Sequence, residues 1–243
     1  MKSKICGITN LEDALLAANN GAWAIGFNFY KNSPRYVSFK KAREITSKLP
    51  KNIIKVGILI DYSKDEMCDA LEFLDLIQIY PSQLNFRGCC LRDSRRSHIP
   101  CVHSCVSNAR RLPEKSSVVG IYGPEVTFLD KSRFILAFQA SSKNELPEHT
   151  LLQEYGYILL DAPKQEDELL GGTGRLSNWD LARELAKDYK LILAGGLNSS
   201  NVLTAIEQVR PFAVDVASGV EERPGIKNPL AVKEFIMGCQ HVE

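Results

Sequence analysis

The chain has 243 residues, of which 44% are hydrophobic and 24% are charged, as is usual for a globular domain and unlike a fibrous or disordered chain. Thirty basic and 29 acidic residues leave a formal net charge of +1, so composition gives no general attraction to nucleic acid or anionic membranes. The apolar runs are too short to span a membrane, and no signal-peptide core is evident. Seven cysteines without CxxC spacing predict reduced thiols, and we expect a cytoplasmic protein.

Short β-branched runs alternate with helical patterns along most of the chain, which predicts repeated βα units around a parallel sheet. In the first third, Asn10 and Ser38 are expected N-caps of the first two helices, at residues 11–20 and 39–49. A third helix is expected within residues 64–74. Strands are expected at residues 3–6, 23–29, 53–60 and 76–80.

The second half of the chain is equally regular from residue 157 onward. Strands are expected at the starts of residues 157–163, 191–198 and 212–220, and helices at residues 179–189, 199–209 and 229–238. One strand is then missing, and we place it at residues 134–139, followed by one helix within 143–156. Residues 99–106 are the rival placement. Residues 81–132 are therefore an irregular insertion between the fourth and fifth strands, and an insertion of that length is usually functional or a sign of misassignment.

Eight strands with intervening helices in this length close most economically as a (β/α)8 barrel, a single α/β domain over residues 1–243. An open doubly wound sheet is the competing architecture. It usually carries a glycine-rich turn after its first strand, whereas the glycine-rich turns of this chain come after the sixth, seventh and eighth strands.

Four side chains with useful chemistry are expected at the carboxyl ends of the strands, where the active sites of such barrels lie. Cys6 ends the first strand and offers a thiol, while Arg35 follows the second and suits a substrate carboxylate. Asp161 ends an apolar strand, where a carboxylate is costly to bury without a purpose or a partner. Asp215 alternates with apolar neighbours, and both a place in the barrel mouth and a structural hydrogen bond remain open for it.

The turns after the seventh and eighth strands predict a phosphate site. Backbone N–H groups of glycine-rich turns bind phosphate without needing a lysine, and barrels of this kind build their phosphate site from these two loops. The expected phosphate ligands are the amides of Gly195, Gly196, Ser218 and Gly219. For either turn alone, the glycines could simply permit a tight connection.

The insertion contains cysteines and histidines whose spacing matches no usual zinc pattern; they are Cys89, Cys90, His98, Cys101, His103 and Cys105. We therefore expect no metal site. Its arginines lack the interleaved aromatic residues of a nucleic-acid surface, so no nucleic-acid partner is expected. A Cys–His nucleophile pair is also poorly supported, because no histidine lies near Cys6 in the sequence.

Several segments together resemble the phosphoribosylanthranilate isomerase family of tryptophan biosynthesis, which has the (β/α)8 fold. The similar segments cover about residues 3–80 and 155–236, and they include "KICGITNLEDAL", "GFNFYKNSPRYVS", "ILLDAP", "GGTGRLSNWDLA", "LILAGGLNSSNVLTAI" and "RPFAVDVASGVEERPGIKN". One departure is "QIYP", in which Tyr80 stands where the family usually has the histidine of "QLHG".

The resemblance implies an Amadori rearrangement of N-(5-phosphoribosyl)anthranilate without metal or cofactor, and no partner beyond this small substrate except a second copy in a homodimer; a monomer is equally compatible. It implies that Cys6 is the general base and Asp161 the general acid. Arg35 would hold the anthranilate carboxylate. The resemblance also implies substrate contacts from Gly172, Thr173 and Asp215.

These roles require a raised pKa for Asp161 and a partly ionised Cys6. Two other hypotheses stay open. One is a related phosphosugar isomerase of histidine biosynthesis, which uses paired aspartates and is disfavoured by Cys6. The other is a non-catalytic phosphate-binding derivative of the barrel, which would have no need of both Cys6 and Asp161.

Overall fold

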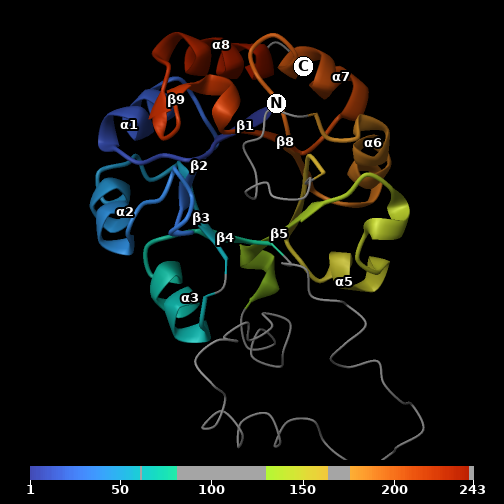
Figure 1. The fold of residues 1–243 in the computed structure, drawn as a ribbon, viewed down its shortest axis with the longest axis horizontal. Coiled ribbons are helices and arrows are strands. Elements are labelled where there is room, and N and C mark those ends of the chain that lie inside the picture. The colour runs from blue at the N-terminus through green and yellow to red at the C-terminus, as the bar shows by residue number, and fades with distance from the viewer. Residues whose placement is uncertain (61, 81–129, 164–175, 241–243) are drawn as a thin grey trace, which may run out of the picture.

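The computed structural model describes residues 1–60, 62–80, 130–163 and 176–240 of the chain. Within these ranges, eight parallel strands close into a barrel in chain order, with β1 beside β8. Figure 1 looks into the ring of strands and shows the helices outside it. The predicted (β/α)8 architecture is therefore confirmed.

The barrel strands match the predicted runs to within a few residues. The strands are β1 (Lys2–Ile5), β2 (Ala24–Asn28), β3 (Ile54–Leu59), β4 (Leu76–Ile79), β5 (Phe134–Gln139), β6 (Tyr157–Asp161), β7 (Leu191–Leu193) and β8 (Ala213–Val216). The favoured placement of the fifth strand is confirmed, because β5 pairs in parallel with both β4 and β6. The rival segment, residues 99–106, lies outside the described residues, as do residues 81–129 of the proposed insertion.

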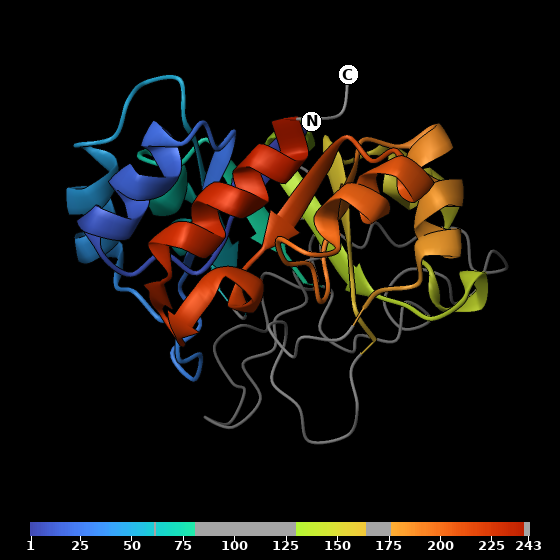
Figure 2. The same cartoon turned by 90° about the horizontal axis from the view of Figure 1, so that it is seen from above.

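Helices cover the outside of the barrel, and Figure 2 shows α8 between α1 and α7. The helices are α1 (Leu11–Asn19), α2 (Phe39–Thr46), α3 (Lys64–Leu71), α5 (His149–Gln153), α6 (Trp179–Asp188), α7 (Val202–Val209) and α8 (Pro229–Gln240). The predicted caps are present, since the Asn10 and Ser38 side chains accept the amide hydrogens of Asp13 and Lys41. No described helix is long and apolar enough to cross a membrane.

One local prediction is wrong. The single helix expected within residues 143–156 consists of a 3-10 turn, η3 (Lys143–Glu145), and the short α5, because Pro147 has no N–H to continue a helix. Between β8 and α8, where the sequence predicts no element, the chain is nevertheless ordered. It forms the 3-10 turn η4 (Ser218–Val220) and the antiparallel hairpin of β9 (Glu221–Arg223) and β10 (Ile226–Lys227) before α8 begins.

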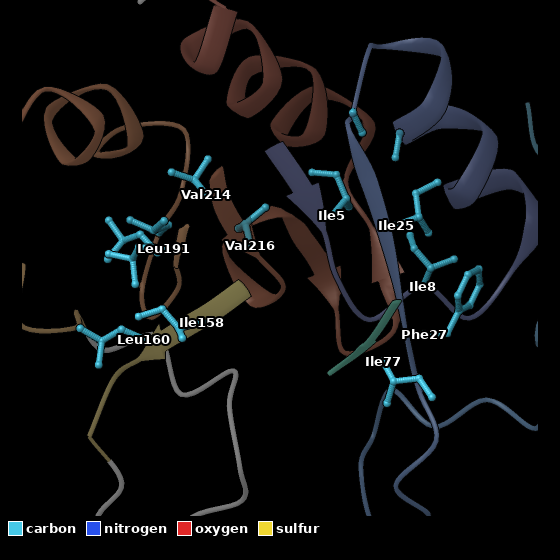
Figure 3. Packing of buried hydrophobic residues seen from close by; sticks show 14 of the residues in the cluster. Ile5, Ile8, Ile25, Phe27, Ile77, Ile158, Leu160, Leu191, Val214 and Val216 are labelled. Carbon is cyan, nitrogen blue, oxygen red and sulfur yellow. The ribbon is translucent and has the colours of Figure 1, made fainter. Parts of the chain in front are cut away.

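The strands bury different residues on their two faces, because successive side chains of a strand point to opposite sides. Outward residues such as Ile5, Ile25, Val214 and Val216 pack with buried helix residues in one apolar cluster (Figure 3). Inward residues form a second cluster inside the barrel. The alternation therefore decides which side chains reach the interior.

The amino end of the barrel is filled by aromatic rings. The ring centroids of Trp23 and Phe212 are 5.6 Å apart, and those of Tyr157 and Phe212 are 5.3 Å apart. The inward side chains at the other end of the same strands include Asp161 and Asp215. The polar groups of the interior therefore lie toward the carboxyl ends.

Candidate active site

One pocket at the carboxyl ends of the strands brings together most of the predicted site residues. Its lining includes Cys6, Arg35, Asp161, Gly195, Gly196, Asp215 and Ser218. Gly219 is not in the lining but belongs to η4 beside it. Gly172 and Thr173 lie outside the described residues.

The Asp215 carboxylate forms an ion pair inside the barrel. Its Oδ1 accepts a hydrogen bond from Lys4 Nζ at 2.9 Å, and the two residues are register partners on β1 and β8. The Lys4 ammonium also donates to Gln78 Oε1 at 3.0 Å. Burial alone would lower the pKa of Lys4, but the charges of Asp215 and Cys6 outweigh it and raise that pKa. Lys4 therefore stays charged in the interior.

The Asp161 carboxyl is buried at the end of β6, with each oxygen beside a different donor. Oδ1 accepts the Ala162 backbone N–H at 2.8 Å, and Oδ2 lies 3.4 Å from the Tyr80 hydroxyl. Burial raises the pKa of Asp161 to about 6, aided by the negative charge of Asp215 and opposed by the hydrogen bonds from Ala162 and Tyr80. This is the direction that a general acid requires.

The Cys6 thiol lies in the same pocket, directly after β1. Burial raises its pKa above the ordinary value of a thiol, while the cations of Lys4 and Lys227 oppose that rise. The partly ionised thiol expected from the sequence therefore does not fit the free protein, because desolvation outweighs the nearby cations. Gly26 on β2 leaves room for the thiol, since an added Cβ there would lie 2.9 Å from Cys6 Sγ.

Arg35 reaches the pocket across Gly7 and is held by Glu221 of β9. Its Nε donates to Glu221 Oε1 at 2.9 Å and its Nη2 to Oε2 at 2.8 Å, in a paired geometry. Lys227 donates to the same carboxylate at 2.9 Å. Burial alone would raise the pKa of Glu221, but these two cations hold it below its usual range. Gly7 has a φ of 75°, which favours glycine, and an added Cβ there would lie 2.6 Å from Arg35 Cδ.

The two glycine-rich turns pack directly against each other. Gly195 and Gly196 have φ angles of 85° and 63°, the left-handed region that glycine adopts without strain. An added Cβ at Gly219 would lie 1.9 Å from the Leu197 carbonyl oxygen. Within the described ranges, no backbone acceptor takes the amide hydrogens of Gly196, Ser218 or Gly219. These backbone N–H groups can therefore donate hydrogen bonds to a bound anion.

Sequence reasoning missed five side chains of this site: Lys4, Gln78, Tyr80 as a hydrogen-bonding group, Glu221 and Lys227. Gln78 and Lys4 could have been found from their alternation with apolar neighbours, which puts them on the inward face. Glu221 could not, because it depends on the hairpin after β8. No group of three or more potential metal ligands occurs in the part of the chain that the structure describes.

The closed barrel and its pocket define a (β/α)8 protein whose partly buried thiol and buried carboxyl suit proton transfer. A family model described as N-(5'phosphoribosyl)anthranilate (PRA) isomerase matches residues 3–87 and 126–237. The chain therefore belongs to the N-(5'-phosphoribosyl)anthranilate isomerase family.

Individual relatives agree with this membership. The N-(5'-phosphoribosyl)anthranilate isomerase of Syntrophus aciditrophicus is 38% identical over 242 residues, which cover 99% of this chain and 87% of that relative. The enzyme of the same name from Thermotoga neapolitana is 36% identical over 239 residues, 97% of each chain. The chain also matches the crystal structure of phosphoribosyl anthranilate isomerase from Thermotoga maritima. The match covers 100% of both chains, with a TM-score of 0.70 and 32% identity.

Proposed function

We infer that the chain catalyses the isomerisation of N-(5'-phosphoribosyl)anthranilate to 1-(2-carboxyphenylamino)-1-deoxyribulose 5-phosphate, a step of tryptophan biosynthesis. The observation that carries this inference is the shared pocket of Cys6 and Asp161, which lies beside the two glycine-rich turns. Family membership supplies the substrate. A related structure, 30% identical to this chain, is a complex with reduced 1-(o-carboxyphenylamino)-1-deoxyribulose 5-phosphate.

The first step is opening of the sugar ring, with Asp161 as the general acid. Its proton goes to the ring oxygen as the bond from that oxygen to C1 breaks, and the nitrogen lone pair forms a C1=N double bond. The pKa of about 6 supports this role, because a carboxyl with an ordinary pKa near 4 would rarely carry a proton at neutral pH.

The second step is removal of the C2 proton, with Cys6 as the general base. The electrons of the C2–H bond form a C1=C2 double bond, and the electrons of the C1=N bond return to nitrogen. The resulting enolamine becomes the ketone when C1 takes up a proton and the C2 hydroxyl loses one. These transfers balance without a redox partner, so we propose no metal or cofactor.

Binding groups surround this pair. We propose that Arg35, oriented by Glu221, holds the anthranilate carboxylate, and that amides of Gly195, Gly196, Ser218 and Gly219 bind the phosphate. The proximity of the two turns and the unpaired amides support the second assignment. Substrate contacts of Gly172 and Thr173 stay predictions, and so does a substrate contact of Asp215 beyond its ion pair with Lys4.

We further propose a cytoplasmic protein that acts as a monomer or a homodimer. The Thermotoga maritima relative is described as a dimeric protein from which monomers were generated. For this chain, sedimentation velocity at several concentrations measures the oligomeric state directly.

The experiment that tests the proposed function follows the loss of anthranilate fluorescence after freshly made N-(5'-phosphoribosyl)anthranilate is mixed with the protein. We expect the decay to accelerate in proportion to protein concentration. Decay no faster than in buffer, with protein that is folded by circular dichroism, would contradict the function.

A further inference from the structure

A buried chain of hydrogen bonds joins the ion pair of β1 and β8 to the carboxyl at the end of β6. Lys4 donates to Gln78 at 3.0 Å, Gln78 Nε2 donates to the Tyr80 hydroxyl at 3.1 Å, and that hydroxyl lies 3.4 Å from Asp161 Oδ2. Tyr80 is buried in the interior cluster of the barrel. It is also the residue that stands in place of the histidine of the similar family pattern.

The chemistry of the donors fixes the direction of this chain. An ammonium group only donates, so Gln78 must turn its oxygen toward Lys4 and its NH2 toward Tyr80. The tyrosine oxygen then accepts, and its single hydrogen is left for Asp161 Oδ2. Because an amide does not pass a proton along, the chain orients groups and is no route for protons.

The same geometry places the acid proton of Asp161. Oδ1 faces the N–H of Ala162 at 2.8 Å and cannot hold a hydrogen on that side. The proton of the neutral carboxyl therefore belongs on Oδ2, the oxygen beside Tyr80. In the ionised carboxyl, Oδ2 instead accepts the hydroxyl hydrogen of Tyr80.

We propose that Tyr80 is a positioning residue for Asp161: it holds the proton-bearing oxygen and ties it, through Gln78, to the Lys4–Asp215 ion pair. The role in catalysis rests on the proposed function, whereas the effect on the carboxyl does not. A histidine at this place would titrate near neutral pH. Tyr80 keeps its hydroxyl hydrogen, since burial raises its pKa well above the ordinary value of about 10.

Several groups besides Tyr80 act on Asp161. The charge of Asp215 favours the neutral carboxyl, and the Ala162 N–H and the Lys4 ammonium favour the ionised one. Cys6 lies in the same pocket. Removal of the Tyr80 hydroxyl leaves these groups in place. We expect it to raise the pKa of Asp161, because the hydrogen bond from Tyr80 to the ionised carboxylate is stronger than a contact with the neutral carboxyl.

The test is a carbon-13 NMR titration of the Asp161 carboxyl in ligand-free protein, assigned by loss of its signal in Asp161→Asn. We expect a midpoint near 6 in the natural chain and a midpoint about 0.5 to 1 pH unit higher in Tyr80→Phe, the order expected for one ordinary hydrogen bond, because the contact is long at 3.4 Å. The control is Tyr155→Phe, which removes the hydroxyl of a buried tyrosine outside the pocket and should leave the midpoint unchanged.

An unchanged or lower midpoint in folded Tyr80→Phe overturns the proposal. If that variant does not fold, replacement of the tyrosines by 3-fluorotyrosine keeps their shape and strengthens the donor, and the midpoint must then fall. The titration needs no substrate, so its failure is distinct from failure of the proposed function. If Tyr80→Phe shifts the titration midpoint of Asp161 but leaves unchanged the pH at which kcat/KM stops rising, the contact between Tyr80 and Asp161 is confirmed and Asp161 is not the general acid.

Discussion

The two faces of the same eight strands differ sharply in what they bury. The outward face is mostly apolar and packs against the helices. The inward face is closed by aromatic rings at its amino end, yet toward its carboxyl end it carries Lys4, Gln78, Asp161 and Asp215, all buried. The barrel therefore places the polar groups that are costly to bury on its inward face, toward the carboxyl ends of the strands.

The difference shows how the fold separates stability from chemistry. Outward residues contribute through apolar burial, which needs no specific partner. An inward charge loses hydration and stays only when it is paired or hydrogen-bonded. The same desolvation raises the pKa values of Asp161 and Cys6, so the inward face is less stable than an apolar core would be but chemically active.

The largest expected effect is on turnover, from changes to the inward acid and base. Cys6→Ser and Asp161→Asn should each lower kcat by about 10² to 10⁴, the usual contribution of general acid–base groups, and leave inorganic phosphate binding nearly unchanged. Fluorescence decay and phosphate titration measure the two quantities. The control is Cys68→Ser, which alters an exposed thiol and should keep full activity. Near-normal turnover in Cys6→Ser or Asp161→Asn would contradict the role assigned to the replaced residue.

The next largest effect concerns the buried ion pair. Asp215→Ala strands the Lys4 ammonium in the interior and should lower the free energy of unfolding by about 3 to 5 kcal/mol. The exposed pair for comparison joins α2 to the end of α3: it is Arg43 with Glu72, whose side chains are 52% and 61% exposed. Glu72→Gln should cost less than about 1 kcal/mol. Urea unfolding measures the free energy of unfolding of both variants. Equal losses would contradict the claim that a buried charge depends on its partner more than an exposed charge does.

Asp161→Asn should also stabilise the folded protein above pH 6. Because the folded pKa of Asp161 is raised to about 6, the stability that this carboxyl contributes is complete below the unfolded value of about 4 and is lost as pH rises through 6. The variant avoids that loss, which is about 3 kcal/mol for a pKa difference of about two units. Urea midpoints at pH 4 and pH 8 test this, and an equal change at both values would contradict the linkage.

The smallest effect lies at a helix end on the outer side of the barrel. Ser38 caps α2 by accepting the Lys41 amide hydrogen at 3.2 Å. Ser38→Ala should cost about 1 kcal/mol of stability without changing turnover, whereas Ser38→Asp should keep the cap. Reduced kcat in a folded Ser38→Ala protein would show that the outer face is coupled to the chemistry.

Much of this contrast is predictable from the sequence, because strand alternation and turn residues are local. The runs around Ile5, Ile77 and Val214 predict the strands, and Cys6 and Asp161 are placed correctly at their ends. The contacts that define the interior are not local: Lys4 meets Gln78 and Asp215 only after the barrel has closed in register. The hairpin that brings Glu221 to Arg35 likewise cannot be predicted from a short polar segment. The break at Pro147 is different, because it follows from a local property of proline.

The account's central claim is that burial on the inward face sets the protonation of both reacting groups. With an acid near 6 and a thiol above its ordinary value of about 8.5, the reactive form, neutral Asp161 with ionised Cys6, is a minor species at every pH. Its fraction rises until Asp161 ionises, stays level, and falls once Cys6 ionises.

The most direct measurement is therefore the pH dependence of kcat/KM, which reports groups of the free enzyme. We predict a rise that levels off near pH 6, a plateau through neutral pH and a fall only above the ordinary pKa range of a thiol. A rise that continues to pH 8 or beyond, or a decline that begins near pH 6, would contradict the account.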